Sequence, residues 1–214
     1  MEKNKVTFLL DKNNNWIELF LLNSTLIKGN DIYNIRISHN HLEVQSQDIV
    51  FILGYTKILN DVFIKSNKLN LVIHESALPK GKGFAPVQWQ ILEGAKFIPV
   101  CLIEATTEVD SGDIIYRHKI ELSGFELYPE IREKQAEATI KIISEFLKIY
   151  PDFNREKQSG LDSFFRKRGI NDGELDIDKS IKQQFNLLRI GNNEGWPSFF
   201  YYEGKKYFLK IYPE

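Results

Sequence analysis

The sequence is poor in several features that would indicate particular classes of protein. It contains one cysteine, Cys101, so no disulfide can form within the chain and a reducing compartment is expected. No apolar run is long enough to cross a bilayer, and the N-terminal stretch turns polar at Asp11, which is unlike a signal peptide. The formal net charge of -1 does not favour a nucleic-acid partner. We therefore expect a soluble cytoplasmic protein without a membrane or nucleic-acid partner.

The sequence does contain short apolar runs. These runs alternate with stretches in which apolar residues recur at helical spacing. The 214 residues are 43% hydrophobic, enough for one sizeable core with a small appendage. Two stretches have helical spacing, Trp16–Leu26 and Tyr128–Tyr150, and Pro151 ends the second. This alternation predicts an α/β fold whose fully apolar strands belong to a parallel sheet. The predicted strands are Val6–Leu10, Tyr33–Ile37, Ile49–Leu53, Leu69–Ile73, Val100–Ile103 and Ile114–Tyr116.

The last quarter of the chain has a different pattern. Residues 152–173 are polar and indicate a connector, after which Asp176 or Asp178 could cap a final helix. The tail predicts a β-hairpin, Phe199–Tyr202 and Tyr207–Tyr212, with its turn at 203–206. Lys205 and Lys206 would then serve as solubilising turn residues. The aromatic hairpin either packs on the core or pairs with a second copy in a homodimer.

Three segments with chemically useful residues follow predicted strands: 54–59, 74–86 and 108–113. In an open parallel sheet, ligands bind beyond the carboxyl ends of the strands, so the segments could share a site. The 80–86 loop combines glycines with two lysines, and is either a flexible phosphate-contacting lid or a solvated loop.

His74, at the end of a predicted strand, is the first candidate catalytic residue. A lone histidine there is more often hydrogen-bonded to backbone, but an imidazole also suits proton transfer near neutral pH. Asp110 lies in a turn and could hold the histidine in one tautomer while stabilising the imidazolium. His39 and His41 form a pair without a convincing third ligand, so we expect an exposed loop there and no metal.

Three blocks of sequence carry a resemblance to a known family. His74, Ser76, Leu78 and Pro79, followed by Gly83 and Pro86, are similar to the His-x-Ser-Leu-Leu-Pro signature of the folate-dependent formyltransferases. Residues 110–114 resemble their Asp-x-Gly-Asp segment, and 48–59 resemble the strand and loop that recognise the pteridine ring. A weaker similarity, around Arg168–Ile177, Asn186–Arg189 and Gly195–Phe199, is to the acceptor side of sugar-nucleotide and methionyl-tRNA formyltransferases.

The resemblance implies a Rossmann-like, mostly parallel sheet with helices on both faces in a catalytic domain over residues 1–150. Residues 151–214 would be an extension with a helix and a β-hairpin. The co-substrate would be formyl-tetrahydrofolate, with His74 relaying a proton or stabilising the oxyanion and Asp110 supporting it. The implied donor-binding residues are Tyr55, Ile58, Leu59, Glu108 and Asp110, and the implied acceptor-binding residues are Ser76, Lys80, Lys82, Gly83 and Arg168.

One position departs from the family pattern. The family has Asn two residues before the histidine, where it helps to hold the formyl oxygen, and this chain has Val72. Asn70 points to the same face of the strand but lies further away, so the role does not transfer to it. Losing an oxyanion donor costs ~100–1000-fold in rate, so a substitute such as Gln88 or a backbone N–H is needed if activity is to be retained.

The resemblance is compatible with four functions, three of which differ in the acceptor. A methionyl-tRNA formyltransferase would carry a further C-terminal domain, for which we see no room, and would favour a basic surface. A glycinamide ribonucleotide formyltransferase would have a glycine-rich loop after the first strand, but residues 11–15 contain no glycine. A non-catalytic folate- or nucleotide-binding homologue would explain Val72. We favour a nucleotide-linked amino deoxysugar of a surface-polysaccharide or glycan pathway.

Overall fold

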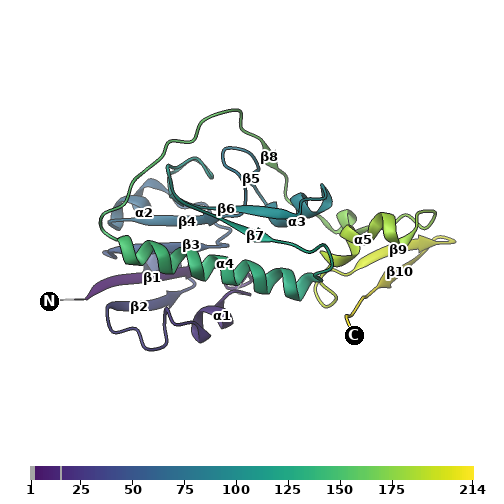
Figure 1. Ribbon diagram of the computed structural model, residues 1–214, viewed down its shortest axis with the longest axis horizontal. Coiled ribbons are helices and arrows are strands. Elements are labelled where there is room, and N and C mark those ends of the chain that lie inside the picture. Colours follow the sequence, from purple (N-terminus) through teal and green to yellow (C-terminus); the bar gives the residue numbers. More distant parts are fainter. Residues whose placement is uncertain (1–2, 15) are drawn as a thin grey trace.

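A six-stranded sheet forms the centre of the molecule, in the order β2-β1-β3-β4-β6-β7 (Figure 1). The computed structural model describes residues 3–14 and 16–214. Strands β1 to β4 run parallel to one another, whereas β6 runs antiparallel to both β4 and β7. The expected mostly parallel α/β sheet is therefore confirmed. The strand bounds are β1 Asn4–Leu10, β2 Tyr33–Ser38, β3 Ile49–Leu53, β4 Asn70–His74, β6 Phe97–Glu104 and β7 Ile114–Glu121.

The sheet is covered on both faces because its strands are apolar on both faces. Phe8 and Phe51 belong to a core on one face, and Leu9 and Val50 to a smaller core on the other, as the period of two in a strand requires. Helices α1 (Glu18–Asn23), α3 (Pro86–Leu92) and α4 (Tyr128–Ile149) contribute to the first core, and α2 (Asp61–Ser66) to the second. Each large side chain buried in this way contributes roughly 1.5–3 kcal/mol.

The helices match the expectations in part. Helix α4 spans nearly the whole expected range and ends before Pro151. Helix α1 is shorter than expected, because Ser24 adopts extended backbone and its hydroxyl donates to the Leu21 carbonyl at 2.6 Å. Helix α5 spans Ile181–Arg189, and its cap is Ser180, so the prediction of Asp176 or Asp178 was wrong. Ser180 and Gln183 form a capping box, which satisfies two backbone N–H groups at once.

The segment between α4 and α5 arches over the sheet as irregular chain (Figure 1). Glu156 exchanges two backbone hydrogen bonds of 2.8 Å with Ile114. Further on, β8 (Phe164–Phe165) pairs in parallel with β5 (Lys82–Gly83). We call residues 151–173 the strap. The strap ends in a short 3-10 turn, Ile170–Gly173. A second 3-10 turn, His41–Glu43, lies elsewhere in the chain, between β2 and β3.

The C-terminal hairpin is formed by β9 (Ser198–Tyr202) and β10 (Lys205–Leu209) (Figure 1). Its turn is tighter than expected: Glu203 and Gly204 both have positive φ, 47° and 76°, as a two-residue hairpin turn requires. Lys205 and Lys206 therefore lie in a strand rather than in the turn. Within the described part of the chain, no helix has both the length and the apolar character needed to cross a membrane.

Candidate active site

A cavity of about 900 Å³ opens where the ends of β3 and β4, helices α3 and α4, and the C-terminal extension meet. His74 and Asp110 both line it. Its other walls come from the 54–59 loop, the 104–111 loop, residues 167–173 of the strap and the hairpin. Distant parts of the sequence thus enclose one volume around the two candidate catalytic residues.

His74 is the last residue of β4 and is only 5% exposed. Its Nε2 lies 2.8 Å from the Gly81 carbonyl oxygen. Because a carbonyl can only accept, Nε2 carries the hydrogen, and Nδ1 is the lone-pair nitrogen of the neutral ring. Nδ1 lies 3.5 Å from Oδ2 of Asp110, within ion-pair distance once the imidazole is protonated. The tautomer is therefore set by a backbone hydrogen bond, as is common for a histidine at a strand end, and not by Asp110 as expected.

Asp110 reaches His74 by an indirect route. Since β6 is antiparallel to β4, Glu104 at the carboxyl end of β6 pairs with Leu71 near the start of β4. The following loop must therefore run back along β4 to bring Asp110 to His74. Asp110 has a positive φ of 52°, and its Oδ2 accepts from the Gly83 N–H at 2.8 Å. Gln158 of the strap donates to its carbonyl, also at 2.8 Å.

The glycine-rich loop 80–86 is tied to the strap, so neither expectation for it, a flexible lid or a solvated loop, describes it. Gly81 N–H donates to the Ser163 hydroxyl at 2.9 Å, and Phe84 N–H to the Phe165 carbonyl at 3.0 Å. Gly83 has φ +97°, and a Cβ there would lie 2.5 Å from the Phe165 oxygen. Only glycine allows this approach of two backbones.

The residues implied for the acceptor divide into two groups. Gly83 and Arg168 line the cavity, whereas Ser76, Lys80 and Lys82 do not. Lys82 is 6% exposed and donates to the Ser111 hydroxyl at 2.8 Å, which gives it a structural position. Ser76 is 1% exposed, and its hydroxyl has no hydrogen-bond partner in the described part of the chain. Lys80 is exposed.

All five residues implied for the donor line the cavity: Tyr55, Ile58, Leu59, Glu108 and Asp110. Tyr55, Leu59, Ile64, Val72 and Ala105 pack on the smaller core, and we call them the apolar wing. The Tyr55 hydroxyl lies 2.9 Å from Nδ1 of His41, so this histidine helps to fix the loop. His39 instead faces Glu18 at 3.4 Å, and the two histidines thus have separate structural partners.

Val72 places an aliphatic side chain in the cavity where the family pattern has Asn. Asn70 cannot replace it, because its amide donates to the Ile64 carbonyl at 2.9 Å and the residue is 4% exposed, outside the cavity lining. Gln88 in α3 does line the cavity, and its side chain makes no hydrogen bond to the described residues. Gln88 is therefore an amide available to a ligand.

Apart from Lys57 in the 54–59 loop, four cations line the cavity from α4, the strap and the hairpin, and we call them the cationic wing: Arg132, Lys167, Arg168 and Lys206. Nη1 of Arg168 is buried without a hydrogen-bond partner in the described structure, and burial lowers the pKa of this guanidinium. The Arg132 guanidinium lies 4.6 Å from the centre of the Trp16 ring. Lys206 lies 3.4 Å from the centre of the Phe199 ring, which corrects its expected role as a turn residue.

Sequence reasoning missed the contribution of α4. Arg132, Gln135 and Thr139 line the cavity from a helix whose remaining inward residues are mostly apolar. Their spacing of three and four residues places them on one face. Polar residues at this spacing on an otherwise apolar face were the signal that could have found them. Lys206 had no comparable signal, because its position depends on the fold of the hairpin.

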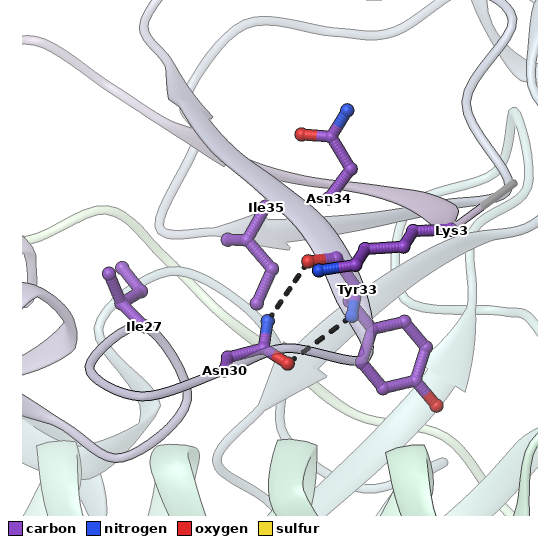
Figure 2. Close-up of a pocket in the computed structure, with 6 residues that line it drawn as sticks. All are labelled: Lys3, Ile27, Asn30, Tyr33, Asn34 and Ile35. Atoms are coloured by element: carbon purple, nitrogen blue, oxygen red, sulfur yellow. Dashed lines mark hydrogen bonds between the residues drawn. The ribbon is translucent and has the colours of Figure 1, made fainter.

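A second hollow lies at the opposite end of the sheet, beside the amino ends of β1 and β2 (Figure 2). Its volume is about 520 Å³. The side-chain amide of Asn30 forms two hydrogen bonds of 3.2 Å with the backbone of Tyr33, so its polar groups already have partners within the protein (Figure 2). No acid, histidine or thiol is among the described residues that line this hollow, whereas His74 and Asp110 line the larger cavity.

Comparison with known proteins identifies the family. A family model described as Formyl transferase matches residues 3–147. The bifunctional polymyxin resistance protein ArnA of Wigglesworthia glossinidia brevipalpis is 29% identical over 170 residues, which are 76% of this chain and 25% of that protein. Several methionyl-tRNA formyltransferases match at similar identity, and the chain spans about half the length of these relatives or less.

Solved structures share the fold at low identity. A methionyl-tRNA formyltransferase from Clostridium thermocellum superposes with a TM-score of 0.80 at 20% identity, covering 97% of this chain and 92% of that one. A 4-N formyltransferase from Francisella tularensis gives 0.72 at 20%, covering 99% and 98%. HypX from Aquifex aeolicus, solved with tetrahydrofolic acid, gives 0.77 at 17%, covering 100% and 38%. Since the family model spans more than half of its residues, the chain belongs to the formyl transferase family of enzymes.

Proposed function

We propose that the protein transfers a formyl group from formyl-tetrahydrofolate to the amine of a nucleotide-linked amino deoxysugar. The observation that carries this proposal is that one cavity is lined by His74 and Asp110, by an apolar wing and by a cationic wing that come from different parts of the chain. The apolar wing suits the flat pteridine of the donor, which supplies the formyl carbon when bound. The cationic wing suits the phosphates of a sugar nucleotide.

The proton transfers assign roles to the two catalytic candidates. The acceptor amine must lose a proton and the donor nitrogen must gain one. Nδ1 of His74 is the basic nitrogen, because Nε2 donates to Gly81. Asp110, 3.5 Å away, stabilises the imidazolium that forms. Gln88 offers an amide N–H to the developing oxyanion in place of the Asn that Val72 replaces.

Methionyl-tRNA is the second candidate acceptor, and the match to the Clostridium thermocellum structure favours it. The test is therefore a mass-spectrometric assay with formyl-tetrahydrofolate and nucleotide-linked 3-amino and 4-amino deoxysugars, with methionyl-tRNA in a parallel reaction. We expect one sugar nucleotide to gain the mass of a formyl group. Formylation of methionyl-tRNA alone would select the second candidate and overturn the first.

The variant that tests the proposed catalytic centre in this assay is His74→Ala, and its matched control is His118→Ala. We expect the variant to lose ~100–10,000-fold in rate and to keep its affinity for the folate, since His74 is proposed to move a proton rather than to hold the pteridine. His118→Ala, on β7 and outside the cavity, should transfer at the wild-type rate. Normal turnover by the His74 variant would contradict the proposed catalytic centre.

A further inference from the structure

The carboxylate of Glu75 lines the cavity, and the proton transfers proposed for His74 and Asp110 do not use it. It directly follows His74, and successive residues of an extended chain point to opposite faces. Both residues nevertheless line the cavity, because the cavity surrounds the end of β4. Glu75 therefore lies on the side of α4, close in sequence to the catalytic histidine and separate from the apolar wing.

The partners of Glu75 hold it in place without neutralising it. Its Oε1 accepts from the side-chain amide of Gln135, and its backbone carbonyl accepts from Gln90 Nε2 at 2.7 Å. Both donors are neutral amides. Across residues 3–14 and 16–214, no Lys, Arg or His forms an ion pair with this carboxylate.

The orientation of Gln135 is itself fixed. Arg132 Nη1 donates to Gln135 Oε1 at 2.8 Å, so the amide nitrogen of Gln135 must face Glu75. Gln135 is 5% exposed, which leaves it little freedom to rotate. A partly buried carboxylate is unfavourable without a cation, and here the structure presents it to the cavity in one direction. Such a group is suited to a cation that arrives with a ligand.

We propose that Glu75 binds the ammonium group of the acceptor and so positions the amine beside His74. This inference rests on the proposed function and adds the direction of the substrate. The amine lies at Glu75, to which Arg132 is joined through Gln135, and the phosphates lie at the other members of the cationic wing, Lys167, Arg168 and Lys206. The ammonium loses two protons in all. One leaves to solvent before the attack and frees the lone pair that forms the new C–N bond. The other goes by way of His74 to the donor nitrogen as the bond from that nitrogen to the formyl carbon breaks.

The test is Glu75→Gln, which removes the charge and keeps an oxygen that can accept from Gln135. We expect KM for the amino-sugar nucleotide to rise about tenfold or more, the usual loss when a hydrogen bond loses its charge, while KM for formyl-tetrahydrofolate stays unchanged. Glu93→Gln is the matched control, an exposed carboxylate at the end of α3 and outside the cavity.

A binding measurement separates an ammonium contact from a general loss of shape. Wild-type protein should bind the amino-sugar nucleotide more tightly than the matching hydroxy-sugar nucleotide, and Glu75→Gln should lose this preference. Transfer by the wild type with an unchanged acceptor KM in Glu75→Gln would overturn the inference and leave the proposed function standing. Absence of transfer to every amino sugar by the wild type would overturn both.

Discussion

Asp110 combines two demands on one residue, an uncommon backbone conformation and a charge beside His74, the proposed catalytic histidine. Its positive φ of 52° is tolerated by Asp and Asn better than by other non-glycine residues. Its Oδ2 accepts from Gly83 N–H and faces Nδ1 of His74. Replacement by Asn can therefore remove the charge while keeping the backbone and the hydrogen bond from Gly83.

We expect Asp110→Asn to fold normally and to transfer formyl about 10- to 1000-fold more slowly, because an opposite charge near a protonated imidazole is worth roughly 1–4 kcal/mol. Steady-state kinetics and thermal unfolding would measure the two effects. Asp152→Asn, at an exposed position in the strap, is the control. An unfolded Asp110→Asn would show that the carboxylate serves the turn instead.

At this scale the sequence predicted several residues that line the cavity and missed those that packing places there. His74, Asp110 and the donor loop follow strands and could be found from their order along the chain. Lys82 fits the same motif, yet the strap encloses it against Ser111, which no local pattern could reveal. Lys206 enters the cavity only because a two-residue turn, rather than a longer one, places it in β10.

Among the elements, the contact between β5 and β8 has the strictest steric requirement. Gly83 has a positive φ and also has no space for a side chain. Gly94 has a positive φ of 84° as well, but no atom lies within 4 Å of the position that an added Cβ would occupy. Alanine substitutions at these two glycines therefore have different costs. At Gly94 an added methyl group causes backbone strain alone, whereas at Gly83 it causes backbone strain and also a clash with another backbone.

We expect Gly94→Ala to lower the free energy of unfolding by about 1–2 kcal/mol and to leave transfer intact. Gly83→Ala should lose more stability, expose the strap to proteases and lose most of its activity, because Gly83 N–H also holds Asp110. Thermal unfolding with limited proteolysis would measure this. Equal losses in both variants, with normal transfer, would contradict the proposed role of the contact.

Element prediction succeeded where one stretch of sequence determines the structure. The fully apolar runs became buried strands, and the long helix ended before Pro151 as expected. The two-residue strands β5 and β8 have no pattern of their own, since each exists only because the other is adjacent. The direction of β6 was equally hidden, because an apolar strand has the same composition whichever way it runs.

At the scale of the whole molecule, a buried ion pair joins α5 to the loop before α4. Arg189 is 2% exposed, and its Nη1 lies 3.6 Å from Oε2 of Glu126, which is 6% exposed. Burial acts to raise the pKa of Glu126, but backbone N–H groups of Ser123 and Gly124 outweigh it and hold the pKa at about 2. The ionised carboxylate thus stabilises the folded state.

This pKa predicts a pH dependence of stability. A carboxyl whose folded pKa is depressed contributes above its unfolded pKa of 4.5, and the contribution is lost as the pH falls toward about 2. Its size is up to about 3 kcal/mol. We expect Glu126→Gln to be markedly less stable than wild type at pH 7, with the difference narrowing over that window in urea unfolding.

The control is Glu133→Gln, an exposed position on α4. It should follow the wild-type profile at every pH. A difference between Glu126→Gln and wild type that stays constant down to about pH 2 would contradict the assignment of this pH dependence to Glu126.

The strap also sets where this enzyme could be recombined with a relative. A hybrid joined at Pro151 would take Phe164 and Phe165 from one parent and Lys82 and Gly83 from the other, across a contact that leaves no room for a methyl group. A junction after Phe165 would keep that contact within one parent while still exchanging Arg168, the hairpin and Lys206. Acceptor preference should therefore be transferable between relatives as the block that begins after Phe165, whereas a junction at the end of α4 should give a poorly assembled catalytic centre.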